Sequence, residues 1–380
     1  MGERMTHAPL SPSAAPVWSI CGGSINMPGE RADSASSMEG TAAHEVTANV
    51  MWGESVRAGS ITTNGICVTR EMIEGAEMFA EAFPMDILRQ VSQSATYEYR
   101  AGVCYIESPV KCPAIHPQCY GTPDAWYILD KCIYVKDYKF GFNYVDAFEN
   151  EQGVAYIAGV LDTLELHDDD FRFEFTIVQP RCYSGEGPVR TWSGKVVDLR
   201  PHIDRLRNAA ARAFAGDAPL LAGSHCKYCP AQWQCPAQQR AMTDAFAVAH
   251  AVLPAPMGHG DMAVALRFID AAIVTLKSMQ SSISEEAIAV IRSGGSIPGF
   301  GLEAGRGKLD WNENVSVEEI IAMGQMVGCN LSKAGTVTPT QAKKLGVDTS
   351  VISLYSSHNS GALKLTQTDE SMTRRIFGGG

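Results

Sequence analysis

The spacing of hydrophobic and polar residues changes several times along the chain. The segment Met38–Trp52 contains no proline and predicts a helix, and a second helix is expected over Arg70–Ala82. Residues Thr96–Arg100 and Val103–Glu107 then alternate between apolar and polar side chains, as half-buried strands do. The pattern therefore changes from helical to extended before residue 110.

A hairpin is predicted next. Two β-rich runs, Tyr120–Leu129 and Cys132–Tyr138, are separated only by Asp130-Lys131, which suits a two-residue turn. The elements expected after it are a helix over Phe148–Leu166, a strand over Phe171–Val178 and a helix over Pro201–Phe214. This order predicts a mixed sheet flanked by helices, in the α/β or α+β class.

The chain divides by composition into four regions. After Pro236 helical segments are joined by a Pro/Gly-rich stretch, and from Gly294 the sequence is rich in Gly, Ser and Thr. We expect a flexible N-terminal arm at 1–17, a main domain at 18–240, a linker at 241–260 and a C-terminal accessory domain at 261–380.

Composition and charge narrow the classes of protein. Apolar residues at 45% and charged residues at 19% are typical of a globular protein, and no apolar run reaches the roughly 18 residues of a membrane span. The N-terminus lacks the apolar core of a signal peptide, so a cytoplasmic location is expected. The net charge of −11 argues against coating nucleic acid non-specifically, although a local basic site is compatible with it. The basic stretch Arg181–Arg212 is interpreted as a solvated helix face.

Candidate chemistry lies at the ends of the predicted hairpin. If Asp130 and Lys131 form the turn, Asp124 and Asp137 lie opposite one another and are close enough to share a divalent metal ion. Lys139 is two residues beyond Asp137 and points to the same face, where it can orient or deprotonate a water. A hard cation beside a lysine suits phosphodiester hydrolysis. The pattern D-x12-D-x-K is weak by itself, since chance matches are common.

Residues on the flanking helices strengthen the pattern. His44 precedes the hairpin and can complete a metal site, while Gln152 and Tyr156 follow it at positions i and i+4 of one helix. The order His, Gly-x-x-Asp, Asp-x-Lys, Gln-x-x-x-Tyr resembles the RecB-like branch of the PD-(D/E)XK nucleases. This family often has Glu where Asp137 stands.

The resemblance implies a restriction-endonuclease-like fold and a set of roles. His44, Asp124 and Asp137 would bind Mg²⁺ or Mn²⁺, with the Tyr138 carbonyl as a further ligand, and Lys139 would activate water. Gln152 and Tyr156 would lie beside the active site and contact DNA. The implied activity is that of a metal-dependent deoxyribonuclease, an exonuclease rather than an endonuclease.

The eleven cysteines include one metal-binding pattern. Cys226, Cys229 and Cys235 have the spacing C-x2-C-x5-C, and three thiolates need a fourth ligand, for which Cys21 is the candidate. Adjacency to Cys226 makes His225 an awkward substitute. Cysteine ligation suits zinc or an iron–sulfur cluster. The other seven cysteines are interpreted as small buried side chains.

The cysteine arrangement resembles that of AddB-type and CRISPR-associated iron–sulfur exonucleases. In those families a [4Fe–4S] cluster joins the two ends of the nuclease domain, and the likeness here covers about residues 18–240. The segment Trp18–Val46 also resembles the start of a RecB-like family of phages and prophages. A phage protein of this kind would act in recombination or DNA processing, in the host cytoplasm.

The implied partners are DNA and a phage recombinase or single-strand-binding protein, and an oligomer is compatible with the pattern. Two other hypotheses stay open. The chain could be a non-catalytic DNA-binding or assembly protein on a nuclease scaffold, or a zinc-containing protein unrelated to nucleases.

Overall fold

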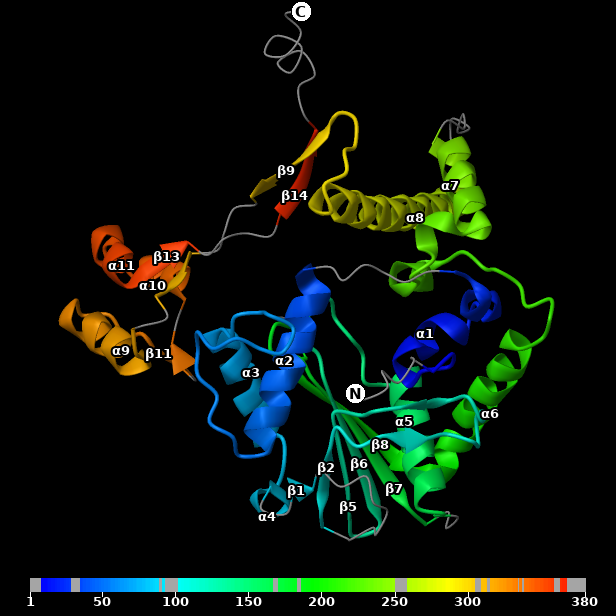
Figure 1. Cartoon of the computed structure of the whole chain (residues 1–380), viewed down its shortest axis with the longest axis horizontal. Helices are drawn as coiled ribbons and strands as arrows, with labels where there is room; N and C mark the ends of the chain where they lie inside the picture. The colour runs from blue at the N-terminus through cyan, green and yellow to red at the C-terminus, as the bar shows by residue number, and fades with distance from the viewer. Residues whose placement is uncertain are drawn as a thin grey trace, which may run out of the picture.

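A mixed six-stranded sheet with helices on both faces forms the centre of the protein (Figure 1). The computed structural model describes residues 8–28, 35–88, 91–92, 102–166, 170–182, 186–249, 258–304, 309–312, 315–333, 335–336, 338–358 and 363–367. In spatial order the strands are β1 (Val91–Ser92), β2 (Cys104–Ile106), β5 (Ala125–Leu129), β6 (Cys132–Tyr138), β7 (Arg172–Val178) and β8 (Val189–Lys195). The fold is of the α+β class, as the sequence predicts.

The predicted hairpin is confirmed with its register. Strands β5 and β6 are antiparallel, and Ala125 pairs with Lys136. The two turn residues Asp130 and Lys131 both have positive φ, at 48° and 56°, which a tight two-residue hairpin turn requires. Asp124, directly before β5, and Asp137, near the end of β6, therefore reach the same end of the hairpin.

Helices cover both faces of this sheet (Figure 1). Helices α2 (Ala35–Met51) and α3 (Arg70–Glu81) pack over a core that includes Phe79, Tyr127 and Tyr138. On the other face α5 (Glu151–Thr163) and α6 (Val196–Ala213) enclose a second core. Because β6 and β7 are parallel, the chain must cross over between them, and α5 is that crossover.

The N-terminal segment is folded where the structure describes it. Residues 12–14 form η1 (Pro12–Ala14), which leads into α1 (Ala15–Trp18). Leu10 and Trp18 are fully buried in the core under α5 and α6, and Trp18 Nε1 donates to the Ser11 carbonyl at 3.0 Å. The prediction of a flexible arm is therefore wrong for residues 8–17. Residues 1–7 and the predicted strand Thr96–Arg100 lie outside the described residues.

Two predicted helices have different starting points in the structure. Helix α5 begins at Glu151, because the Asn150 side chain caps it by accepting from the Gly153 nitrogen at 3.1 Å. Helix α6 begins at Val196, five residues before the predicted start at Pro201. The backbone nitrogen of Lys195 donates to Asp198 at 3.2 Å, so the cap precedes the proline. A strand, β8, leads directly into this helix and was not predicted.

The remaining short elements lie between the main ones. They are η2 (Gly22–Asn26), α4 (Met85–Leu88), β3 (Val110–Lys111), β4 (Tyr120–Gly121), η3 (Ser224–Tyr228) and η4 (Gln232–Gln234). Strands β3 and β4 pair with each other; β3 lies against α5 and β4 against η1.

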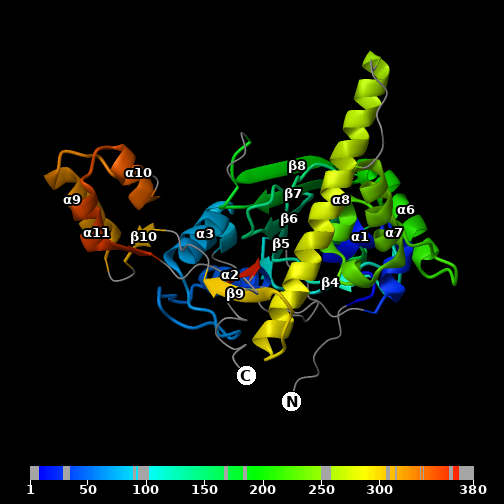
Figure 2. The same cartoon turned by 90° about the horizontal axis from the view of Figure 1, so that it is seen from above.

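The C-terminal part begins with two packed helices, α7 (Pro236–Ala249) and α8 (His259–Arg292) (Figure 2). The predicted linker 241–260 is therefore helical as far as Ala249. A third hydrophobic core follows around Trp311, Ile320 and Leu331. The elements of this part are β9 (Phe300–Ala304), β10 (Leu309–Trp311), α9 (Val317–Met326), β11 (Ser332–Lys333), β12 (Gly335–Thr336), α10 (Pro339–Lys344), α11 (Thr349–Tyr355), β13 (Ser356–His358) and β14 (Leu363–Gln367). Among the described residues, no helix combines the length and the apolar character needed to cross a bilayer.

Candidate active site and cysteine pocket

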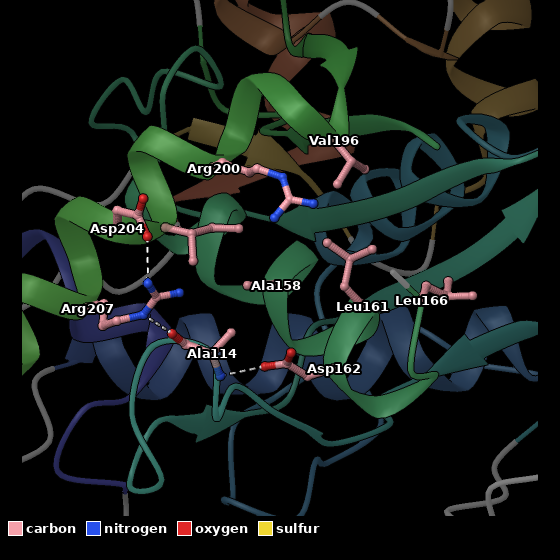
Figure 3. A pocket seen from close by; sticks show the side chains of 10 residues that line it. Ala114, Ala158, Leu161, Asp162, Leu166, Val196, Arg200, Asp204 and Arg207 are labelled. Carbon is pink, nitrogen blue, oxygen red and sulfur yellow. Dashed lines mark hydrogen bonds and ion pairs between the residues drawn. The ribbon is translucent and has the colours of Figure 1, made fainter. Parts of the chain in front are cut away.

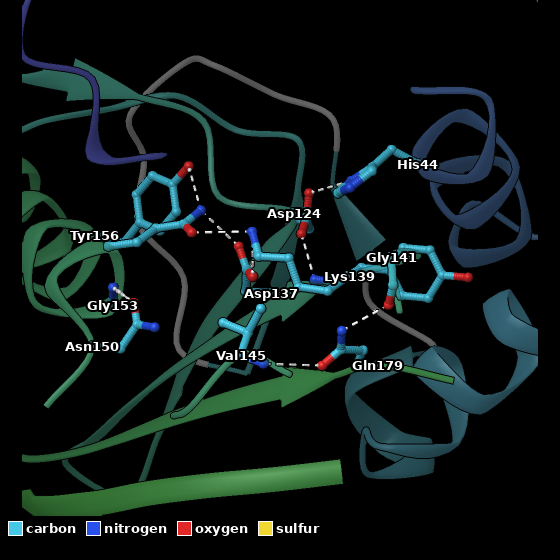
Figure 4. A network of polar contacts seen from close by, with 12 residues as sticks. His44, Asp124, Asp137, Lys139, Gly141, Val145, Asn150, Gly153, Tyr156 and Gln179 are labelled. Atoms are coloured by element: carbon cyan, nitrogen blue, oxygen red, sulfur yellow. Dashed lines mark hydrogen bonds and ion pairs between the residues drawn. The ribbon is translucent and has the colours of Figure 1, made fainter. Parts of the chain in front are cut away.

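The predicted site residues meet at one end of the central sheet (Figure 4). His44 comes from α2 on one side, Tyr156 from α5 on the other, and Asp124, Asp137 and Lys139 from the hairpin between them. The backbone nitrogen of Lys139 donates to the Val178 carbonyl at 2.9 Å. This bond continues the β6–β7 pairing and fixes the lysine beside the end of β6. Sequence residues more than 100 positions apart thus form one polar network.

His44 and Asp124 form the first half of this network. His44 Nδ1 donates to Asp124 Oδ1 at 2.8 Å, and the Tyr138 backbone nitrogen donates to Asp124 Oδ2 at 2.6 Å. Burial alone would lower the pKa of His44, but the charge and hydrogen bond of Asp124 outweigh it and raise this pKa. Burial likewise opposes ionisation of Asp124, yet His44, Lys139 and the Tyr138 nitrogen lower its pKa. Asp124 is therefore held as a carboxylate.

Glu107 is a member of the site that the sequence reasoning missed. Ligand atoms of His44, Glu107 and Asp124 all lie within 4.8 Å of one another. Glu107 follows β2, where Ile106 pairs with Ala125, and its backbone nitrogen donates to the Asp124 carbonyl at 3.0 Å. The only signal in the sequence was its place at the end of a predicted strand.

The crowding of carboxylates changes the titration of Glu107. Although Glu107 keeps exposure to solvent, desolvation by the surrounding site and the neighbouring charge of Asp124 raise its pKa from 4.5 to about 7. A divalent cation would relieve this repulsion, and one imidazole with two carboxylates is a donor set that suits Mn²⁺ or Mg²⁺. The residues present therefore fit such an ion.

Asp137 lies outside this group of three, and its role as a metal ligand stays a prediction. Asp137 Oδ1 accepts from Gln152 Nε2 at 2.8 Å, and Asp137 Oδ2 forms an ion pair with Lys139 Nζ at 2.9 Å. Burial raises the pKa of Asp137, with Asp124 adding to the effect and Lys139 opposing it. Oδ1 of Asp137 is thus hydrogen-bonded, whereas the buried Oδ2 has the ion pair with Lys139 and no hydrogen bond among the described residues.

Lys139 is fixed and charged in this second half. Its Nζ donates to Gln152 Oε1 at 3.0 Å in addition to the ion pair with Asp137. Burial alone would lower the pKa of Lys139, but Asp137 and Asp124 raise it above the ordinary lysine value. Lys139 is therefore protonated at neutral pH, which is compatible with orienting a water and not with deprotonating one.

Gln152 and Tyr156 support the site from α5. Tyr156 OH donates to the carbonyl of Thr122 at 3.0 Å, and Thr122 lies two residues before Asp124. A methyl group at Gly153 would lie 2.7 Å from the Phe175 ring, so this glycine lets α5 approach β7 closely enough for Gln152 to reach Asp137. Gln152 and Tyr156 are 8% and 4% exposed. Their burial fits the expected support of the site but not a direct contact with DNA.

All four cysteines of the predicted cluster line one small pocket. Cys21 precedes η2, while Cys226, Cys229 and Cys235 lie in and after η3 and η4. The backbone nitrogen of Leu221 donates to Cys21 Sγ and that of Gly223 to Cys226 Sγ, both at 3.3 Å. The sequence separation between the first and last of these cysteines shows that the pocket joins the two ends of the region around the sheet.

The chemistry of this pocket fits a bound metal centre. Burial raises the pKa of the Cys226 and Cys229 thiols, and the nearby sulfurs raise both values further. A cationic centre would stabilise these groups as thiolates, and backbone N–H groups are already directed at two of the sulfurs. His225 Nε2 lies 3.0 Å from the Leu221 carbonyl, which leaves Cys21 as the better fourth ligand.

The seven other cysteines differ in exposure. Cys104, Cys112, Cys119 and Cys182 are buried as predicted. Cys67 is exposed, and Cys132 and Cys329 are partly exposed, so the prediction of small buried side chains is wrong for these three.

A second pocket of about 420 Å³ lies between α5 and α6 (Figure 3). Asp162 accepts from the Ala114 nitrogen at 2.8 Å, and Arg207 donates to the Ala114 carbonyl at 2.6 Å. Arg207 also pairs with Asp204. These contacts attach the segment after β3 to the two helices, which is a structural role.

The basic stretch Arg181–Arg212 is exposed at Lys195, Arg200, Arg205, Arg207 and Arg212, as predicted for a solvated face, but not at its first two arginines. Arg181 is buried and pairs with Glu39 and Glu71 at 2.8 and 2.7 Å. Arg190 is also buried and donates to the Val145 carbonyl and to Gln179. These two arginines therefore serve the fold, so the predicted solvated helix face is wrong for them.

Comparison with models of protein families shows the family to which the chain belongs. The model of the family described as "Protein of unknown function (DUF2800)" matches residues 7–355. The chain belongs to the DUF2800 family. The match includes the site at the sheet end, the cysteine pocket and the C-terminal elements as far as Tyr355, so this DUF2800 protein matches its family model over both its main parts.

Proposed function

We propose that this DUF2800 protein is a metal-dependent phosphodiesterase that degrades DNA, acting as an exonuclease in phage recombination or DNA processing. The observation that carries the proposal is the group His44, Glu107 and Asp124, with ligand atoms within 4.8 Å, in one network with the charged Lys139. Hydrolysis of a phosphodiester needs positive charge near the phosphorus oxygens. A metal ion held by the group of three and the ammonium of Lys139 would supply it.

The group of three would hold Mg²⁺ or Mn²⁺. When bound, such an ion polarises a phosphoryl oxygen and lowers the pKa of a coordinated water. Asp124 is kept ionised by His44 and the Tyr138 nitrogen, so it is available as a ligand at neutral pH. Glu107 would become fully ionised once the ion offsets the charge of Asp124.

Lys139 supplies a fixed positive charge next to this group. Asp137 and Gln152 restrict its Nζ at 2.9 and 3.0 Å, so little reorganisation is needed when negative charge develops on a substrate phosphate. The same ammonium can donate a hydrogen bond to a water and orient it. Asp137 thus positions Lys139.

DNA as the substrate is supported by the order of motifs along the chain, which resembles that of RecB-like nucleases. A digestion assay tests it directly, with end-labelled single- and double-stranded DNA, Mg²⁺ or Mn²⁺, and a chelator control. Metal-stimulated release of label is expected. If neither DNA is cut with either ion, the alternative of a non-catalytic DNA-binding or assembly protein replaces the proposal.

For the cysteine pocket we propose a [4Fe–4S] cluster that joins the N-terminal segment to residues 226–235. Four sulfurs around zinc each lie about 2.3 Å from the ion and therefore close together. The cluster is favoured over zinc by the resemblance of the C-x2-C-x5-C spacing, with the distant Cys21, to that of AddB-type iron–sulfur exonucleases. Thiols kept for a metal also suit the cytoplasm, where disulfides are rare.

The absorption spectrum of anaerobically purified protein tests the identity of the centre. A brown protein with a broad band near 400 nm and bound iron is expected from an iron–sulfur cluster. A colourless protein that contains zinc would show that the pocket holds zinc instead.

A further inference from the structure

Helix α8 carries a row of exposed apolar side chains along one face. The row consists of Met262, Leu266, Ile269, Ile273, Leu276 and Ile283, and we call it the α8 seam. All six side chains are exposed, Leu266 at 62%. Contiguous apolar surface of this kind usually marks an interaction site.

The spacing of the seam is that of a coiled coil. Successive members are separated by four, three, four and three residues from Met262 to Leu276, and Ile283 follows one heptad after Leu276. Gln280 occupies the remaining core position. The seam extends over about 32 Å at 1.5 Å per residue, which is three heptads.

The seam is separate from the face that α8 uses within the chain. Met279 is 2% exposed, and Gln232 of η4 donates a hydrogen bond to the Ser278 hydroxyl. At about 100° per residue, Met279 lies roughly a quarter turn from the middle of the seam. Figure 2 shows the N-terminal end of α8 extending beyond the sheet and its helices. Intramolecular packing therefore leaves the seam uncovered as far as Ile283, and the next residue of this row, Ala287, is buried.

Two charged residues beside the seam indicate what covers it. Asp270 and Lys277 are exposed and occupy equivalent heptad positions on the side of the seam away from Met279. In an antiparallel pair of α8 helices with Ile273 opposite Leu276, Asp270 of one copy lies beside Lys277 of the other. Twofold symmetry repeats this ion pair, so the dimer contains two such pairs.

A parallel pair would not use these charges. There, each of the two positions faces a residue five places earlier in the other helix, which is Ala265 for Asp270 and Ala272 for Lys277. The charges are thus complementary only in the antiparallel arrangement.

We propose that α8 mediates dimerisation of the chain as an antiparallel coiled coil through the α8 seam, with Asp270 and Lys277 fixing the register. This inference is independent of the proposed nuclease activity.

Sedimentation of the full-length protein and of matched variants tests the proposal. The wild-type protein is expected to be a dimer, and Ile273→Glu should make it monomeric because it places two charges at the centre of the seam. Val274→Glu is the control, since Val274 is 50% exposed on the same helix but lies about a third of a turn away. Circular dichroism should show equal helix content in all three proteins.

Charge exchange tests the orientation. Asp270→Lys should weaken the dimer about tenfold, and the double variant Asp270→Lys with Lys277→Asp should restore it. A monomeric wild-type protein, a dimeric Ile273→Glu variant or a monomeric Val274→Glu variant would overturn the proposal. Failure of the double variant to recover would overturn the antiparallel register.

Discussion

The backbone nitrogen of Glu107 donates a 3.0 Å hydrogen bond to the carbonyl oxygen of Asp124. This bond extends the pairing of β2 with β5 by one residue and holds the two carboxylates side by side. Desolvation and the close approach of Asp124 together oppose ionisation of Glu107 and raise its pKa. A site that tolerates this repulsion is suited to bind a cation.

Glu107→Gln should therefore weaken metal binding. The amide keeps the size of the side chain but removes one of the two negative charges that the ion would meet, so the affinity for Mn²⁺ should fall by about tenfold or more. Isothermal titration calorimetry measures the change. Glu165→Gln is the matched control, because Glu165 is also exposed and also has positive φ, at 51°, but is not in the group of three. Equal affinities in the two variants would contradict the assigned role of Glu107.

Lys139→Met should abolish most of the cleavage while leaving Mn²⁺ bound. The variant removes the fixed ammonium charge, and loss of one preorganised donor typically lowers kcat by about 10² to 10³. Rates with end-labelled DNA and a parallel Mn²⁺ titration separate the two effects. Lys111→Met, an exposed lysine on β3, should cleave at the wild-type rate. A Lys139→Met protein with the wild-type rate would show that the lysine has no part in the reaction.

The metal-free protein should lose stability as the pH rises from about 4.5 to 7. The folded-state pKa of Glu107 is about 7 against 4.5 for the ordinary side chain, so the folded protein holds the extra proton in this interval and loses that advantage above it. Thermal unfolding in chelator across this interval, compared with Glu107→Gln, isolates the contribution. The variant should show a smaller decrease, and added Mn²⁺ should restore stability above pH 7. A decrease of the same size in the variant would assign it to other groups.

The proposed [4Fe–4S] cluster predicts that Cys235→Ser contains less iron and that the region around the sheet is destabilised. Cys235 lies at the start of α7 and shares its pocket with Cys21, so loss of the centre releases the link between the two ends. Iron content, absorbance near 400 nm and the thermal midpoint should all fall. Cys67→Ser changes an exposed thiol outside the pocket and should alter none of them. Retained iron in the Cys235→Ser protein would exclude Cys235 as a ligand.

The central part of the site could be predicted from the sequence because a two-residue turn fixes the register of a hairpin. Once Asp130 and Lys131 form the turn, the positions of Asp124 and Asp137 follow from pairing, and the structure agrees. Glu107 could not be found in this way. Residues between β2 and β5 form a separate pair of short strands, so no tight turn fixes the register that places Glu107 beside Asp124.

The side-chain contacts of Asp137 and the folded N-terminal segment could not be predicted, for a similar reason. Backbone pairing brings Asp137 to the site, but the side chains of Lys139 and Gln152 decide where its carboxylate points. The Ser, Pro and Ala content of the first residues is typical of a flexible arm, yet Leu10 and Trp18 are buried under α5 and α6. Both outcomes depend on tertiary contacts that local sequence patterns do not contain.

The most direct test compares the wild-type protein with Asp124→Asn in the Mn²⁺-dependent digestion of end-labelled DNA. Asp124 belongs to the group of three and accepts hydrogen bonds from both His44 and the Tyr138 nitrogen, so its charge is central to the proposed metal site. The proposal predicts chelator-sensitive digestion by the wild-type protein and none by Asp124→Asn, with equal folded structure by circular dichroism. Equal digestion by the two proteins, or none by the wild type, would contradict it.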